Sequence, residues 1–181
     1  EFYRNKLEYT FSDFRWLTEE EMNMAPEERD MDALGFHMPG MFDRVIDIEK
    51  CYLQPEPSNR IRLELKKFAK QQVLSFFNVR TFTGDLRNVI IRNTNTGDLM
   101  VIMVFGVDEA DKVKLVMNFL EENFPMITSL YYVINLKQND SISDLEPVLW
   151  KGEAFMTEKM ENLHFRIGPL SFFKTNNRQD L

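Results

Sequence analysis

The chain has 181 residues, a net charge of −7, a single cysteine and 44% hydrophobic residues. This length suits one domain, or one domain with a small appendage, and the composition is typical of a soluble globular chain. The lone Cys51 excludes an internal disulfide framework and fits a reducing compartment, and no apolar run approaches the roughly 18–20 residues of a membrane-spanning helix.

Most of the negative charge lies in one stretch. Residues 17–32, LTEEEMNMAPEERDMD, hold seven acidic residues and one Arg, which gives −6, so the remaining 22 acidic and 21 basic residues leave −1. Because phosphate binding depends on clustered Lys and Arg, a nearly neutral remainder neither indicates nor excludes nucleic-acid binding. The stretch lacks periodicity and contains Ala-Pro, and we interpret it as a solvated loop.

The first half of the chain predicts three strands and one helix. The predicted elements are an alternating, half-buried strand over 6–17, a hairpin with strands over 33–38 and 42–48, and an amphipathic helix within 55–77 capped by Ser58 or Asn59. The mostly apolar stripe of the helix consists of Ile61, Leu65, Phe68, Ala69, Gln72, Val73 and Phe76.

The second half predicts a hairpin, a helix and further strands. The predicted elements are a hairpin over 86–106 that turns at NTNTGD, a helix over 107–125 capped by Asp108, a continuously apolar strand over 127–136, and shorter strands over 144–168. We therefore expect an α+β fold in which two amphipathic helices pack on a mainly antiparallel β-sheet.

The sequence contains no recognisable catalytic or cofactor motif. Its seven glycines form neither G-x-G-x-x-G nor G-x-x-x-x-G-K-[ST], the patterns that hold nucleotide phosphates. His37 and His164 lie in no metal motif, and no nucleophile elbow or Ser-His-Asp signature occurs. A lone Cys51 is typical of a buried, inert thiol, since its neighbours supply no base. The residues alone do not indicate a self-contained enzyme.

Five stretches, in chain order, carry a resemblance: YRNKLEYTFS, LGFHMPGMFDRVIDIEKCYLQP, GDLRNVIIRNTNTGDLMVIMV, SLYYVINLKQND and GPLSFFKTNNRQ. Together they resemble the S-adenosylmethionine-dependent RNA uracil-5-methyltransferases, in particular the bacterial 23S ribosomal RNA enzymes. No single motif is decisive, but five in the right order cover essentially the whole chain.

The resemblance implies a domain organisation. Residues 1–168 would form the central domain of such an enzyme, which helps to position RNA, and residues 169–181 would begin its Rossmann-like methyltransferase domain. That second domain would bind S-adenosylmethionine and supply the thiolate that adds to C6 of uracil, so we expect this chain alone to be inactive. The alternatives are part of a transfer RNA enzyme, or a stand-alone α+β interaction module. We expect a cytoplasmic monomer with RNA as its partner and no membrane association.

The resemblance also implies residues that contact RNA. Arg4 and Lys6 are the first candidates, because residues two apart on a strand share one face. Arg87 and Arg92 come next. Each of these cations could instead pair with a neighbouring acid.

Three further residues receive roles from the resemblance. Phe172 would stack on a displaced base, or would equally belong to an interdomain core. Lys174 stands where the family has a Gln near the cofactor, and its ammonium, a donor only, would meet the cofactor carboxylate or an RNA phosphate. Cys51 matches the fourth cysteine ligand of a four-iron, four-sulfur cluster that many members hold. The other three ligands lie upstream in the family, so we expect no cluster in this chain alone.

Overall fold

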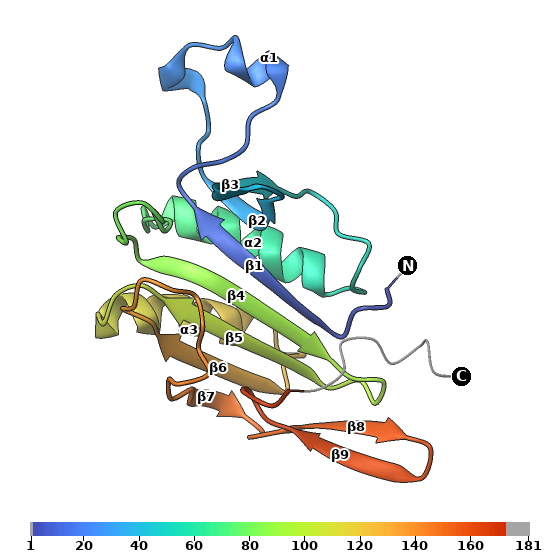
Figure 1. Ribbon diagram of the computed structural model, residues 1–181. Coiled ribbons are helices and arrows are strands. Elements are labelled where there is room, and N and C mark those ends of the chain that lie inside the picture. The colour runs from blue at the N-terminus through green and yellow to red at the C-terminus, as the bar shows by residue number, and fades with distance from the viewer. Residues whose placement is uncertain (1, 173–181) are drawn as a thin grey trace.

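The computed structural model describes residues 2–172, which form one seven-stranded sheet, two long helices and a two-stranded ribbon (Figure 1). The sheet contains β1 (Lys6–Ser12), β2 (Ala33–Met38), β3 (Met41–Asp47), β4 (Leu86–Asn93), β5 (Leu99–Phe105), β6 (Ser129–Ile134) and β7 (Val148–Gly152). The ribbon pairs β8 (Met156–Met160) with β9 (Leu163–Ile167). The helices are α1 (Glu19–Met22), α2 (Ser58–Gln71) and α3 (Ala110–Asn123), with a 3₁₀ turn at Pro26–Glu28.

The strand order in the sheet is β3-β2-β1-β4-β5-β6-β7. Every neighbouring pair is antiparallel except β5 and β6. That pair is parallel because α3 connects the two strands and returns the chain to the end where β5 began. The predicted α+β fold with a mainly antiparallel sheet is therefore confirmed.

Each face of the sheet has its own apolar core. On one face, α2 and α3 pack side by side behind the strands in Figure 1, with the rings of Phe68 and Phe119 stacked at 4.0 Å. On the other face, Ile90 and its neighbours on β5 and β6 contact Met156 and Ile167 of the ribbon. Because side chains alternate along a strand, one run of apolar residues in β4 and β5 supplies both cores.

The predicted helix caps are wrong for a tertiary reason. The Ser58 hydroxyl donates to Gln54 Oε1 at 2.7 Å, and Asn59 Oδ1 accepts the backbone N–H of Cys51 at 2.8 Å. Both side chains are thus occupied in the buried interior, and α2 has no side-chain cap. Neither does α3, so Asp108 does not cap it.

The ends of two predicted elements also differ. Val73, predicted in the buried stripe, has a φ of 55° and is 88% exposed, because the chain leaves α2 in a left-handed turn. The acidic stretch is not simply a loop, since Thr18 and Glu21 form a capping box at the start of α1. Figure 1 shows this stretch standing away from the sheet. No helix within residues 2–172 is long and apolar enough to cross a membrane.

A buried guanidinium joins α2 to the sheet. Arg62 is 0% exposed, and its Nη atoms donate to the carbonyls of Leu34, Ile48 and Glu49. Burial lowers its pKa. Arg62 therefore fixes the irregular segment after β3 by satisfying carbonyls that have left the sheet.

Replacing this guanidinium should destabilise the fold. We expect Arg62→Leu to lower the free energy of unfolding by about 3 kcal/mol, because the buried carbonyls of Ile48 and Glu49 lose their charged donor. Urea unfolding followed by circular dichroism measures the effect. Lys67→Leu, on the exposed side of the same helix, is the matched control and should change stability by less than about 0.5 kcal/mol. Equal losses in the two variants would contradict the role given to Arg62.

Candidate nucleic-acid interface

The segment before β1 is held from both sides by backbone hydrogen bonds. Phe2 and Arg4 donate their N–H groups to the carbonyls of residues 52–53, at 2.8 and 2.9 Å, and the Asn5 carbonyl accepts from Asn93 at 3.0 Å. The segment thus runs between the chain that precedes α2 and the end of β4. Its side chains are presented from a fixed backbone.

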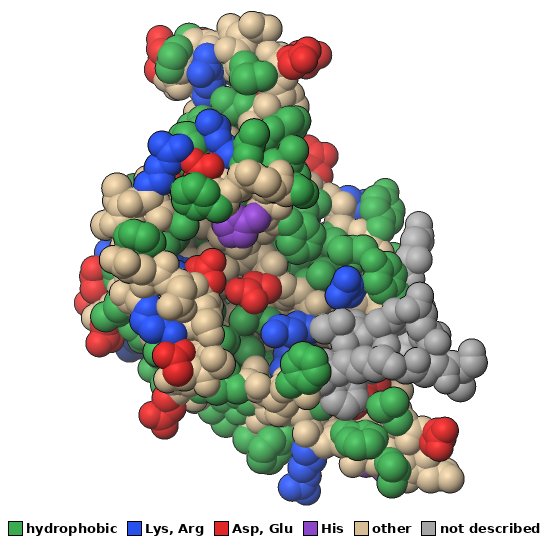
Figure 2. Space-filling view, viewed as in Figure 1, with side chains coloured by type: hydrophobic (Ala, Val, Ile, Leu, Met, Phe, Trp, Pro, Cys, Tyr) green, Lys and Arg blue, Asp and Glu red, His purple; other side chains and the backbone are tan. Residues whose placement is uncertain are grey.

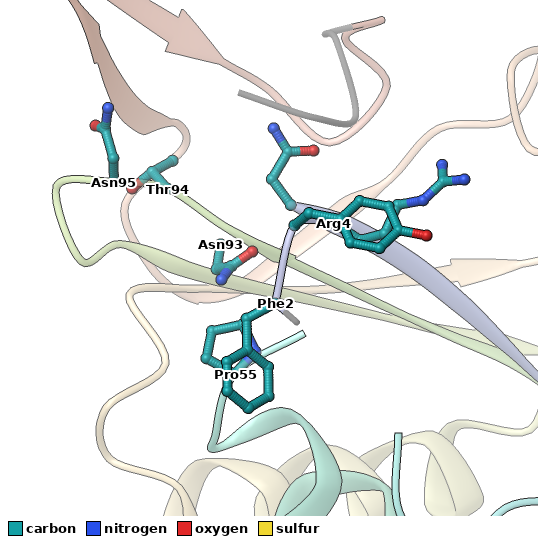
Figure 3. A pocket seen from close by; sticks show the side chains of 8 residues that line it. Phe2, Arg4, Pro55, Asn93, Thr94 and Asn95 are labelled. Carbon is teal, nitrogen blue, oxygen red and sulfur yellow. The ribbon is translucent and has the colours of Figure 1, made fainter. Parts of the chain in front are cut away.

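A hollow of about 290 Å³ lies between this segment and the β4–β5 turn (Figure 3). We call it the terminal hollow. Figure 3 shows Phe2 beside Pro55 on one side and Thr94 and Asn95 on the other, with Asn93 between them. The full lining is Phe2, Tyr3, Arg4, Asn5, Pro55, Asn93, Thr94 and Asn95.

The side chains of the terminal hollow suit an unpaired nucleotide. Tyr3 is 40% exposed, and the Arg4 guanidinium lies 5.6 Å from the centre of its ring. Asn93 Oδ1 is buried and has no hydrogen-bond partner within residues 2–172. Aromatic rings stack on bases, amides pair with base edges, and an arginine meets phosphate. The hollow brings all three kinds of group together.

A second hollow of about 240 Å³ lies on the sheet face away from the helices, and we call it the sheet hollow. Its lining comprises Lys6, Glu8, Ile90, Asp140, Ser141, Ile142, Ser143, Pro169 and Leu170. Figure 2 looks onto this face, where acidic and basic side chains are interspersed rather than gathered into one basic patch.

The structure separates the two first candidates for RNA contact. β1 begins at Lys6, and the backbone bends at Asn5, so Arg4 lies outside the strand. Arg4 lines the terminal hollow and Lys6 lines the sheet hollow. The argument from one strand face therefore applies to Lys6 alone.

The next two candidates are buried in the fold. Arg87 is 2% exposed, donates to the carbonyl of Lys137 at 2.6 Å and pairs with Asp140 at 2.7 Å. Arg92 is 3% exposed, and its Nη1 donates to three carbonyls of residues 168–171 at 3.1 to 3.3 Å. Neither guanidinium is open to RNA, so the prediction of RNA contact is wrong for both. The alternative of an acid-paired cation is correct for Arg87.

Of the two predicted site residues near the end of the chain, the structure describes Phe172 but not Lys174. Phe172 is 100% exposed, directly after the segment that Arg92 holds, so its ring is free to stack. Lys174 lies outside the described residues. The predicted contact of Lys174 with the cofactor therefore stays a prediction.

Cys51 sits in a buried polar cluster. It is 5% exposed, and its backbone N–H and C=O both bond to the Asn59 side chain, at 2.8 and 3.0 Å. Burial raises the pKa of the neighbouring Tyr9 hydroxyl, with Cys51 adding to the effect. No group of three metal-ligating side chains occurs among the residues that the structure describes. These residues can therefore supply one sulfur ligand, and an iron–sulfur cluster does not fit them alone.

Proteins similar in sequence carry the names of RNA methyltransferases. An uncharacterized RNA methyltransferase of Bacteroides thetaiotaomicron is 49% identical over 182 residues, which is 99% of this chain and 40% of that protein. A second, from Porphyromonas gingivalis, is 46% identical over 186 residues, again 99% and 40%. The tRNA (uracil(54)-C(5))-methyltransferase of Pyrococcus horikoshii is 29% identical over 151 residues, which is 82% of this chain and 35% of that protein. No protein-family model matches the chain.

Solved structures share the fold. The Pyrococcus abyssi tRNA (uracil-54, C5)-methyltransferase, crystallised with S-adenosyl-L-homocysteine, superposes with a TM-score of 0.69. The match covers 96% of this chain and 37% of that chain at 22% identity. At this identity the likeness shows the fold.

Fold and relatives together place the chain among the RNA methyltransferases. More narrowly, its sequence motifs resemble those of the S-adenosylmethionine-dependent RNA uracil-5-methyltransferases, and the similar proteins from Pyrococcus horikoshii and Pyrococcus abyssi carry uracil-C5 names. The chain spans about 40% of the length of the curated relatives from Bacteroides thetaiotaomicron and Porphyromonas gingivalis.

Proposed function

We propose that this chain is the RNA-positioning part of a methyltransferase that modifies C5 of uridine, with 23S ribosomal RNA as the first candidate substrate. The observation that carries the proposal is the terminal hollow, where exposed Tyr3, the Arg4 guanidinium and an Asn93 oxygen without a partner in residues 2–172 converge. The Tyr3 ring could stack on a base, the Asn93 amide could pair with its edge, and Arg4 could bind a phosphate. Family membership supports the same conclusion.

The chemistry would take place outside the described residues. S-adenosylmethionine would supply the methyl group, but residues 2–172 contain no glycine-rich loop to hold it. In this proposal residues 169–181 begin the methyltransferase domain, and Phe172 stacks on a base displaced beside it. What the described residues do is bind and orient RNA, as a monomer in the cytoplasm.

A transfer RNA is the second candidate substrate. Two of the similar proteins, from Pyrococcus horikoshii and Pyrococcus abyssi, carry names that specify uracil-54 of tRNA. Their identities of 29% and 22% are lower than the 49% of the relative from Bacteroides thetaiotaomicron, whose name specifies no RNA. The interspersed charges of Figure 2 suit either RNA.

We also propose that Cys51 ligates a four-iron, four-sulfur cluster in the full-length protein. The family resemblance and the burial of the thiol support this role. The cluster would stabilise the segment that Asn59 and Arg62 already hold. It needs three further cysteines, because Cys51 is the only one in this sequence.

Truncation of side chains in the terminal hollow should weaken RNA binding. We expect Tyr3→Ala and Arg4→Ala each to raise the Kd for a single-stranded RNA about 5- to 10-fold, because one stacked base or charged contact is lost. Fluorescence anisotropy with the 181-residue chain measures this. Lys114→Ala, which removes an equal charge from the exposed side of α3, should leave the Kd within about twofold. Equal losses in Arg4→Ala and Lys114→Ala, with none in Tyr3→Ala, would show that only net charge matters.

The full-length enzyme and this chain should differ in cofactor binding. We expect calorimetry to show S-adenosylmethionine binding to the full-length protein, and no binding to the 181-residue chain below about 1 mM. Micromolar binding by the chain alone would place the cofactor site within it.

RNA from a strain that lacks the gene should have lost one 5-methyluridine, and its position would identify the substrate. Unchanged RNA would contradict the proposed function.

The cluster proposal has a separate test. Full-length protein with Cys51→Ser, reconstituted with iron and sulfide, should lose most of its iron and the visible absorption of the cluster, because one of four thiolate ligands is missing. Ser129→Ala, another buried substitution, controls for folding and should retain both. Full iron content in the Cys51→Ser protein would rule out this ligand.

A further inference from the structure

The sheet hollow has apolar walls and a polar rim. Its floor is Ile90, which is 2% exposed and lies directly across the strand pair from Glu8. Ile142 and Leu170 form apolar walls. At about 240 Å³ the hollow is smaller than the roughly 300–1,000 Å³ of pockets for drug-sized ligands. One flat nucleobase suits this volume and lining.

The charged side chains of the sheet hollow differ in whether they already have an ion-pair partner. Asp140 is already paired with Arg87 at 2.7 Å. Glu8 and Lys6 lie two residues apart on the same face of β1, and the side chain of neither makes a hydrogen bond or ion pair in the part of the chain that the structure describes. Among the described residues that line the hollow, they are the two charged groups left to meet a ligand.

Partial desolvation strengthens a hydrogen bond that the Glu8 carboxylate accepts. Its side chain is exposed, yet the walls of the hollow desolvate the carboxylate and raise its pKa, an effect that Lys6 opposes and Asp140 adds to. A hydrogen bond to a partly desolvated carboxylate is stronger than one in open water. A phosphate does not fit here, because two carboxylates would face it against one ammonium.

We infer that the sheet hollow binds the edge of one unstacked guanine, with the Glu8 carboxylate accepting from N1–H and N2–H and the Lys6 ammonium donating to O6. This inference rests on the proposed function and adds a base preference to it. Ile90 and Leu170 would contact the faces of the ring. Lys6 then reads a base, rather than a phosphate.

The donor pattern separates guanine from the other bases. A carboxylate has two acceptor oxygens and, when ionised, no donor. Guanine presents two adjacent N–H donors and a carbonyl on one edge. Adenine and cytosine present one amino donor beside an acceptor nitrogen, which would repel the second oxygen of Glu8. Uracil presents a single N–H, so its expected affinity lies between that of adenine or cytosine and that of guanine.

The test compares RNA oligonucleotides that differ at one base. The probes are oligocytidine and the same chain with one central guanosine, inosine or uridine, measured with the 181-residue protein by fluorescence anisotropy. We expect the guanosine probe to bind about tenfold more tightly than oligocytidine, in line with about 1–3 kcal/mol for a good bidentate base contact. Inosine, which lacks the N2 amino group, should fall between them.

Two substitutions assign the preference to these residues. Glu8→Gln should reduce the guanosine preference to less than about twofold and leave oligocytidine binding unchanged, because the amide offers only one acceptor oxygen. Lys6→Gln should reduce the preference for the guanosine probe over oligocytidine at least twofold. Glu122→Gln, an equal change on the exposed side of α3, should retain it. Circular dichroism verifies that each variant is folded.

The outcomes separate this inference from the function on which it rests. If the wild-type protein binds all four probes equally, or if Glu8→Gln keeps the preference, the guanine site is wrong while RNA binding stands. If uridine binds more tightly than guanosine, the assigned base is wrong. If no probe binds at all, the proposed RNA-positioning function fails together with the guanine site.

Discussion

The described chain depends on buried guanidinium groups that bind backbone carbonyls. Arg62, Arg87 and Arg92 are each at most 3% exposed, and each donates to carbonyls that lie outside regular strands. Burial lowers the pKa of Arg62 and Arg92, yet arginine stays charged because its ordinary pKa is so high. A charge buried without several carbonyl partners would be costly. The three irregular segments are therefore anchored to the body of the fold by charged hydrogen bonds.

This anchoring bears on how a nearly neutral surface could bind RNA in the proposed function. Net charge outside residues 17–32 is −1, and Figure 2 shows both signs interspersed on the sheet face. Counterion release by clustered cations cannot then supply most of the affinity. Stacking and base-edge hydrogen bonds remain, and both require side chains that are already in place. Hollows with fixed walls provide that, at the cost of slower electrostatic steering.

Periodicity was sufficient to predict the strands, both long helices and the α+β class, because those elements pack by one apolar face. It could not predict the helix caps, since the side chains of Ser58 and Asn59 have partners that only the tertiary fold brings near. Nor could it show that Arg87 and Arg92 are buried. In sequence they are charged side chains of the kind that is mostly exposed, but the segments around 137 and 170 cover them. The two hollows were likewise beyond prediction, as each combines residues far apart in the chain.

The cross-strand pair Lys6–Arg92 has a geometric consequence. One member lines the sheet hollow, and the other holds the carbonyls that lead to Phe172. A single pair of neighbouring residues on β1 and β4 thus connects the sheet hollow with the last described residues of the chain. In the proposed function the chain would act as a ruler: a nucleic acid seated against β1 would present its next nucleotides at a set distance from Phe172. Selection of one position in a long RNA would then follow from spacing as well as from sequence.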